Sequence, residues 1–65
     1  MARYTMTYKV RDEVMLTIRS AEGEGYESFL SVCRQAIAEF EEVHPEYQNV
    51  GHADVEDDWT TRQIW

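Results

Sequence analysis

The sequence lacks most of the devices that stabilise or anchor small domains. Its single cysteine, Cys33, cannot form an internal disulfide, whereas small secreted domains usually need several. Its longest uninterrupted apolar run, 14–16, is far too short to span a membrane, and no apolar signal-peptide core is found near the N-terminus. We therefore expect a cytoplasmic protein without membrane association, whose fold depends on its hydrophobic core without the help of disulfides.

Basic residues are scarce as well, with six lysines and arginines against 13 aspartates and glutamates and a net charge of −7 over 65 residues. A chain of this length forms one domain, 1–65, with a single small core. An apolar content of 43% excludes a disordered chain. The charge is uneven, at +2 for residues 1–20 and −9 for residues 21–65. Such a surface repels nucleic acid and anionic membranes and attracts basic partners.

Polar and apolar side chains alternate over 3–11 and again over 14–20, which predicts two half-buried strands joined as a hairpin. A two-residue loop at 12–13 puts the two apolar rows on opposite faces, whereas a three-residue loop at 11–13 gives one apolar face. We therefore expect the second register, or one shifted from it by two residues. It pairs Val10 with Val14, Tyr8 with Leu16 and Met6 with Ile18.

The apolar period changes after a glycine-containing loop at 21–25. Residues from Tyr26 to Val43 follow helical spacing, which predicts an amphipathic helix over 26–43 that starts near Gly25 to Ser28 and ends before Pro45. Two short strands are expected at 47–56 and 59–65, with the turn at 57–58. Their expected inward residues are Val50, Ala53, Val55, Trp59 and Ile64. This β-β-α-β-β order predicts an α+β fold, a small antiparallel sheet with one helix packed on one face.

No catalytic, cofactor or metal pattern stands out. One cysteine and two histidines are too few for a structural zinc site, and His52 beside Asp54 is interpreted as an exposed pair. The acids at 54–58 do not have the spacing of an EF-hand loop. Cys33 lies on the apolar stripe of the helix, which predicts a buried, inert thiol. We expect neither an enzyme nor a bound cofactor or metal.

The basic residues of the hairpin suggest a nucleic-acid surface, and the sequence argues against it. They lie on the polar face of the two strands: Arg3, Lys9, Arg11 and Arg19. A sheet that reads single-stranded RNA carries stacking aromatics on that same face, but Tyr4 and Tyr8 are in phase with the core. Direct nucleic-acid binding is therefore not expected.

The acidic residues are the most informative feature. Glu39, Glu41 and Glu42 lie at the C-terminal end of the helix, where the helix dipole disfavours negative charge, and Arg34 is the only base on that helix. Local rules are often broken at functional sites. Carboxylates at this end and on the following strands can imitate the phosphates of DNA. The candidate partner-binding residues are Glu39, Glu41, Glu42, Glu46, Asp54, Glu56, Asp57 and Asp58, with Tyr47, Trp59 and Trp65 as aromatic anchors.

In size, acidity and single-domain profile, the chain resembles the small acidic anti-defence proteins that phages carry, including anti-CRISPR proteins and other DNA mimics. The resemblance implies non-catalytic inhibition in the cytoplasm of the host, in which the acidic surface blocks the basic nucleic-acid channel of a defence effector complex. The alternative is a regulatory interaction module, an antitoxin or scaffold subunit, that binds through its sheet edge and aromatic residues. In either case the chain acts as a monomer or a small homo-oligomer.

Overall fold

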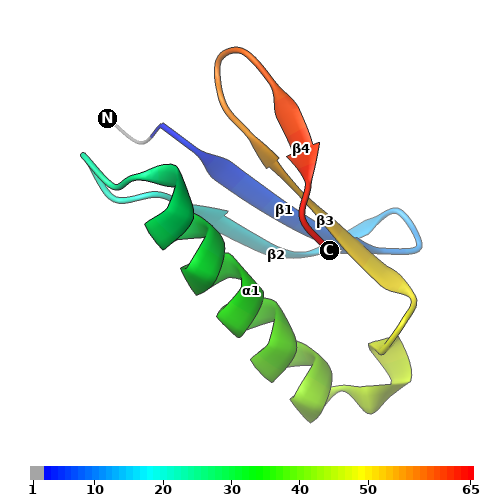
Figure 1. Cartoon of the computed structure of the whole chain (residues 1–65). Helices are drawn as coiled ribbons and strands as arrows, with labels where there is room; N and C mark the ends of the chain where they lie inside the picture. Colours follow the sequence, from blue (N-terminus) through cyan, green and yellow to red (C-terminus); the bar gives the residue numbers. More distant parts are fainter. Residues whose placement is uncertain (1–2) are drawn as a thin grey trace.

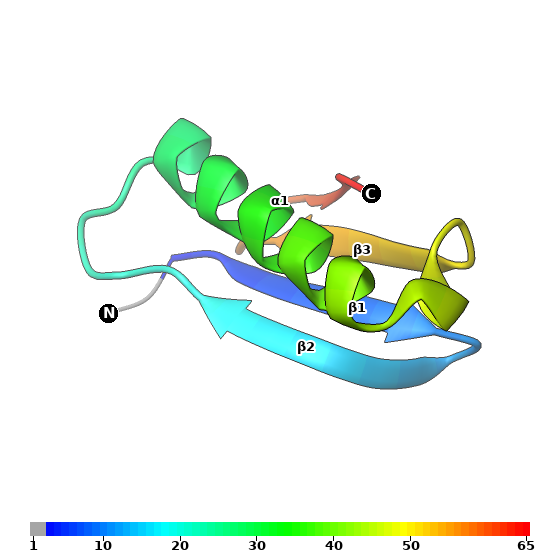
Figure 2. The same ribbon diagram turned by 90° about the horizontal axis from the view of Figure 1, so that it is seen from below.

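The computed structural model describes residues 3–65 and has the predicted α+β architecture. Strands β1 (Thr5–Val10), β2 (Glu13–Arg19), β3 (Gly51–Glu56) and β4 (Thr61–Gln63) form one antiparallel sheet in the order β2-β1-β3-β4. Helix α1 (Tyr26–Val43) connects the two hairpins and covers one face of the sheet (Figures 1 and 2). The element order β-β-α-β-β and the helix on one face are confirmed.

The hairpin register is confirmed along most of its length and wrong at the turn. Met6 lies opposite Ile18 and Tyr8 opposite Leu16, but Val10 lies opposite Glu13 rather than Val14. The loop has two residues, Arg11 and Asp12, with φ angles of 53° and 67°. This is the left-handed backbone that tight hairpin turns require. A bulge opposite Tyr8 and Lys9 then shifts the pairing by one residue, which keeps Leu16 and Ile18 on the face of Tyr8 and Met6. Val14, also predicted to point inward, instead lies opposite Lys9 and is 52% exposed.

Helix α1 has the predicted bounds. Gly25 precedes it as the N-terminal capping residue, and the N–H of His44 closes its last turn on the carbonyl of Phe40 at 2.9 Å. The residues buried against the sheet recur every four positions: Phe29, Cys33, Ile37 and Glu41. Val43, predicted to belong to the apolar stripe, is instead 73% exposed. Val43 is the last residue of the helix, which leads through His44 into a short 3-10 helix, η1 (Pro45–Tyr47).

The core lies between α1 and the inward row of the sheet. Four alternate residues of the N-terminal strand are buried: Tyr4, Met6, Tyr8 and Val10. The helix contributes its stripe, and the C-terminal hairpin contributes Ala53, Val55 and Ile64. No buried side-chain polar atom among residues 3–65 is without a hydrogen-bond partner. The fold is therefore closed on the helix side, while the opposite sheet face carries only polar side chains from β1 and β3.

The prediction for residues 47–65 is only partly correct. Residues 47–50 lie in η1 and the turn that follows it, so the third strand starts at Gly51, and the fourth has only three residues. Of the residues predicted to point inward, Val50 is 46% exposed and Trp59 is 86% exposed. Trp59 lies outside both strands, in the turn between β3 and β4. An apolar side chain there has no sheet position from which to reach the core.

The buried thiol gives a first testable consequence of this core. Cys33 has no solvent exposure, and burial raises the pKa of its thiol to about 11. Only the thiolate reacts, so we expect a disulfide reagent at pH 8 to modify folded protein at least about 100-fold more slowly than protein unfolded in guanidinium. The absorbance of the released thiolate measures both rates. Equal rates would mean that the thiol is open to solvent in the folded state.

Candidate functional site

The eight candidate acids occupy three separate regions of the molecule rather than one surface. Glu39 and Glu42 are exposed on α1, and Glu46 is exposed on η1. Asp54 and Glu56 lie on β3, on the sheet face away from the helix. Asp57 and Asp58 lie in the β3–β4 turn. The eighth acid, Glu41, is buried.

The helix end and the β3–β4 turn are at opposite ends of the fold (Figure 1). The ring of Tyr4 lies 5.6 Å from that of Tyr26 at the start of α1, and the ring of Tyr8 lies 5.6 Å from that of Phe40 near its end. Four residues of strand separate Tyr4 from Tyr8, about 13 Å. The expectation that acids from both regions form one continuous row is therefore wrong. The acids of the two regions are close in the sequence, but strand β3 lies between these regions and separates them in space.

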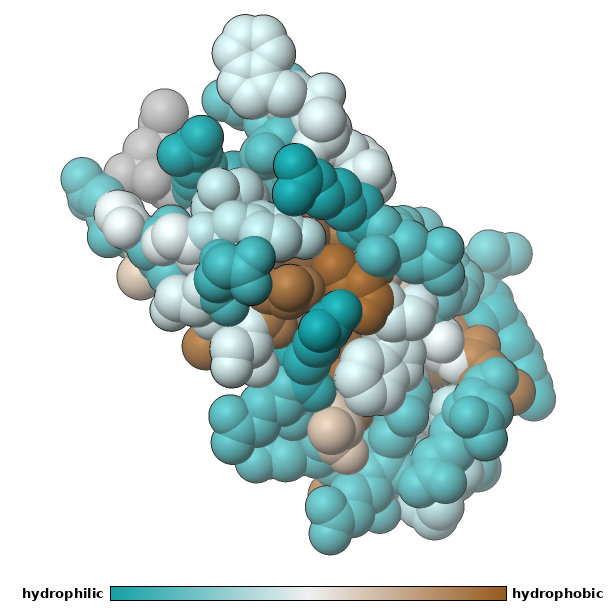
Figure 3. All heavy atoms as spheres, viewed as in Figure 1, coloured by the Kyte–Doolittle hydropathy of each residue, from teal (hydrophilic) through white to brown (hydrophobic). Residues whose placement is uncertain are grey.

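The helix-end acids are the exposed Glu39, Glu42 and Glu46, and no lysine or arginine lies between them in the sequence. The last turn of α1 and the following η1 contain no lysine or arginine. Between described residues, the only ion pair within 4.0 Å joins His44 to Glu46, at 3.5 Å. Glu39 and Glu42 are three residues apart, which places them on neighbouring positions of the helix surface. The face of the molecule in Figure 3 is mostly hydrophilic, with its largest apolar area between α1 and β4 and smaller apolar areas at the edges of the view.

Aromatic packing holds η1 against the end of the helix. The ring of Tyr47 stacks on that of Phe40 at 5.9 Å, and the His44 ring lies 4.7 Å from Phe40. The side-chain amide of Gln48 donates a hydrogen bond to the carbonyl of Glu41 at 3.3 Å. The segment that carries Glu46 is thus fixed relative to the helix. Tyr47, predicted as an aromatic anchor for a partner, is half-buried and contributes to this packing.

Glu41 corrects the prediction that every acid of the helix end projects into solvent. It is only 8% exposed, and its Oε2 accepts hydrogen bonds from the hydroxyl of Tyr8 at 2.7 Å and from the indole N–H of Trp65 at 3.0 Å. The residue follows Ile37 by four positions and therefore faces the sheet. Burial, with the hydrogen bond to Glu41, holds the pKa of the Tyr8 hydroxyl far above its usual value. The carboxylate links α1, β1 and the C-terminal residue, so its role here is structural.

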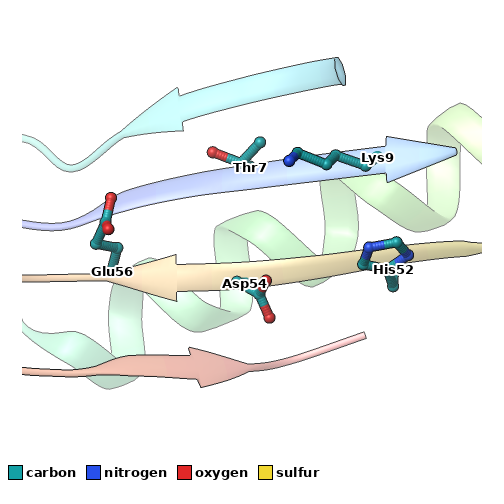
Figure 4. A pocket seen from close by; sticks show the side chains of 5 residues that line it. All are labelled: Thr7, Lys9, His52, Asp54 and Glu56. Carbon is teal, nitrogen blue, oxygen red and sulfur yellow. The ribbon is translucent and has the colours of Figure 1, made fainter. Parts of the chain in front are cut away.

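The outer face of the sheet mixes charges of both signs. A shallow hollow of about 210 Å³ is lined by Thr7, Lys9, His52, Asp54 and Glu56, whose side chains stand on the two central strands (Figure 4). The register places Lys9 opposite His52 and Thr7 opposite Asp54. His52 lies at one end of the hollow and Glu56 at the other, and the amino group of Lys9 reaches toward Thr7 between them (Figure 4). Nothing here forms an acidic row.

The acids of the β3–β4 turn also have a basic residue near them. One of these acids, Asp57, stabilises the turn. Arg3 lines a second hollow of about 290 Å³ together with Thr5, Glu56, Asp57 and Asp58. The carboxylate of Asp57 accepts hydrogen bonds from the backbone N–H groups of Trp59 and Thr60, both at 2.8 Å. These bonds hold the pKa of Asp57 below its usual value. Asp57 therefore acts as the cap of its turn.

The two tryptophans differ in solvent exposure and in hydrogen bonding. Trp59 is 86% exposed on an ordered turn, as an anchor for a partner has to be. Trp65 is 37% exposed, and its indole N–H is committed to Glu41.

Nowhere in residues 3–65 do three metal-ligating side chains come together. The helix of this part of the chain is not apolar enough to cross a bilayer. Comparison with protein-family models, curated proteins and solved structures found no match.

Proposed function

We propose that the protein is a non-catalytic binding protein that presents Glu39, Glu42 and Glu46 to a basic, nucleic-acid-binding surface of a partner protein, in the manner of a DNA mimic. The observation that supports the proposal is that Glu39 and Glu42 are exposed near the helix end that disfavours negative charge, with no lysine or arginine in the last turn, and that the exposed Glu46 follows them in η1. A stable fold gains nothing from that arrangement. A basic partner does, because it supplies the missing cations.

The geometry of the patch is compatible with a phosphate row. Glu39 and Glu42 are about 4.5 Å apart along the helix axis at 1.5 Å per residue. Each strand of duplex DNA presents one charge about every 3.4 Å. Glu46 extends the series beyond the helix on the packed η1 segment. Acids on such a rigid support bind a basic groove without first having to be ordered.

The experiment replaces Glu39, Glu42 and Glu46 by glutamine and compares capture of a bacterial defence effector complex, the partner class that the resemblance implies, at low and high salt. We expect the wild type to capture the complex in a salt-sensitive way, to compete with duplex DNA, and to bind at least about tenfold more tightly than the variant. The free energy of unfolding should stay unchanged or rise slightly, because unfavourable charges leave the helix end.

A matched control separates position from net charge. Asp12→Asn, Glu13→Gln and Glu27→Gln remove three other exposed acids, so the net charge changes equally. If both triple variants lose binding to the same extent, general acidity and not the helix end is responsible. If neither loses it, the proposed acidic site is rejected.

The exposure of Trp59 favours a second candidate function, an interaction module that binds a partner through an aromatic anchor. This module predicts binding that salt hardly affects and that Trp59→Ser abolishes while the three glutamine substitutions leave it intact. The same capture experiment therefore distinguishes the two functions.

A further inference from the structure

Strand β2 is a sheet edge that the helix does not fully cover. Met6 and Tyr8 of β1 have no exposure, whereas their neighbours Ile18 and Leu16 on β2 are only partly buried. Figure 2 shows β2 outside the area beneath α1, with no other element along its far side. The inward row of this strand therefore presents apolar surface where the sheet stops.

The flank of α1 that faces this edge is mostly apolar. The opposite flank belongs to the C-terminal side, because the guanidinium of Arg62 lies 4.9 Å from the Tyr26 ring and Trp65 donates to Glu41. At 100° per residue, the side nearer β2 carries Val32, Ala36, Phe40 and Val43, with the exposed Glu39 at its outer margin. Val32 is 48% exposed, and Ala36 and Phe40 are partly buried. Helix and edge strand thus border one apolar strip.

At alternate residues of β2, the backbone N–H and C=O groups point away from β1. The N–H of Ser20 donates to the carbonyl of Tyr4 at 3.0 Å, so Ser20 forms a hydrogen-bonded pair with β1. Such pairs alternate along an antiparallel ladder, which assigns Ile18 and Leu16 to the same side. The N–H and C=O groups of Thr17 and Arg19 therefore point to the open edge, where no strand in residues 3–65 takes them.

We propose that this edge pairs with β2 of a second copy of the chain, forming a symmetric antiparallel dimer with one continuous sheet. With the two Thr17 residues opposite each other, Leu16 of each copy lies beside Ile18 of the other on the helix face. The helix flanks then close over the joined apolar strip. The bulge limits regular pairing to the part of β2 from Leu16 onward.

Charge selects the antiparallel arrangement. Strand β2 itself carries a negative charge at its first residue, Glu13, and a positive charge at its last, Arg19. Antiparallel pairing brings each negative end to a positive one, whereas parallel pairing places like ends together. The N-terminal hairpin is also the one part of this acidic chain with net positive charge, at +2 for residues 1–20. Two copies therefore meet where their overall repulsion is smallest.

The test is the mass in solution of wild-type protein and of Thr17→Pro and Thr17→Ala, by sedimentation equilibrium from micromolar to millimolar concentration. Proline removes an N–H that points to the open edge and leaves the β1–β2 hydrogen bonds intact, a position at which strands tolerate proline. We expect the wild type and Thr17→Ala to reach twice the mass of one chain. Thr17→Pro should remain folded by circular dichroism and associate at least about tenfold more weakly.

A wild type that stays monomeric over the whole range overturns the proposal, and so does a folded Thr17→Pro that dimerises like the wild type. Should Thr17→Pro unfold, amide hydrogen exchange of the wild type decides: protection of Thr17 and Arg19 that grows with concentration supports the dimer, and unchanged protection contradicts it. Protection that appears only on addition of an extended peptide would assign the edge to another protein's strand and would also overturn the proposal.

Discussion

Glu41→Ala is expected to lower the free energy of unfolding by about 3 kcal/mol, although it removes one of three glutamates within four residues of an acidic helix. The substitution leaves the Tyr8 hydroxyl and the Trp65 indole without their acceptor, and the first of these is buried. A domain of this size has a total of only about 3–10 kcal/mol. Denaturation followed by circular dichroism measures the loss.

The neighbouring Glu42 supplies the matched control. Its side chain is exposed, so Glu42→Ala is expected to change stability by less than about 0.5 kcal/mol. Glu41→Gln keeps an acceptor oxygen and should be less damaging than alanine. Combining Glu41→Ala with Tyr8→Phe should lower the free energy of unfolding by about 1–2 kcal/mol less than the sum of the single substitutions, because both substitutions remove the same hydrogen bond. Equal effects of alanine at 41 and 42 would mean that the buried carboxylate does not hold the fold.

The contrast between these two neighbours shows what the sequence could reveal about the candidate site. Charge identified both glutamates, but only helical phase separates them: position 41 continues the buried series through Cys33 and Ile37, and position 42 does not. That signal was present in the sequence. The partners of Glu41 were not, because a hydrogen bond across 33 residues to Tyr8 depends on the packing of helix on sheet.

The first strand and the helix were predictable because each has one clear period. Alternation defined β1, and a stripe at helical spacing defined α1 to the residue. The hairpin turn was not predictable, because two kinds of connection place the apolar residues of both strands on one face. One is a three-residue loop, and the other is a two-residue loop followed by a bulge. The chain uses the second, with Arg11 and Asp12 in left-handed backbone. Asp is tolerated there and Arg less so, which made that turn hard to foresee.

The C-terminal third has no dominant period, and the prediction was weakest there. A three-residue β4 is too short to show alternation, and Trp59 was assigned to the core because it is apolar. In the fold, Asp57 caps the turn and holds Trp59 outside. Spatial separation of the acids at 54–58 from the helix end follows from strand order, which no local pattern encodes. Whether either group binds a partner stays a prediction.

Gly51→Ala is expected to cost about 3 kcal/mol, a loss that arises from crowding rather than from a missing contact. A Cβ at this position would overlap the Tyr8 ring, with Cζ at 2.5 Å and Cε1 at 2.6 Å. The ring has little room to move, because it has no exposure, packs edge-on against Phe40 and donates its hydroxyl to Glu41. The unfolding transition measured by circular dichroism should therefore shift to lower denaturant concentration.

Gly25→Ser is the control. A side chain at this N-capping position meets nothing within 4 Å, and serine is a better cap than glycine, so the free energy of unfolding should stay the same or rise slightly.

A smaller side chain at position 8 tests whether overlap with the Tyr8 ring causes the loss. Tyr8→Leu is destabilising by itself, but if the overlap with the ring is the cause, adding Gly51→Ala to it should cost clearly less than in the wild type. An undiminished cost in the Tyr8→Leu background would instead locate the problem in the backbone at the start of β3. The outcome also bears on Glu41, because a ring confined by Gly51 is what keeps the Tyr8 hydroxyl aimed at that carboxylate.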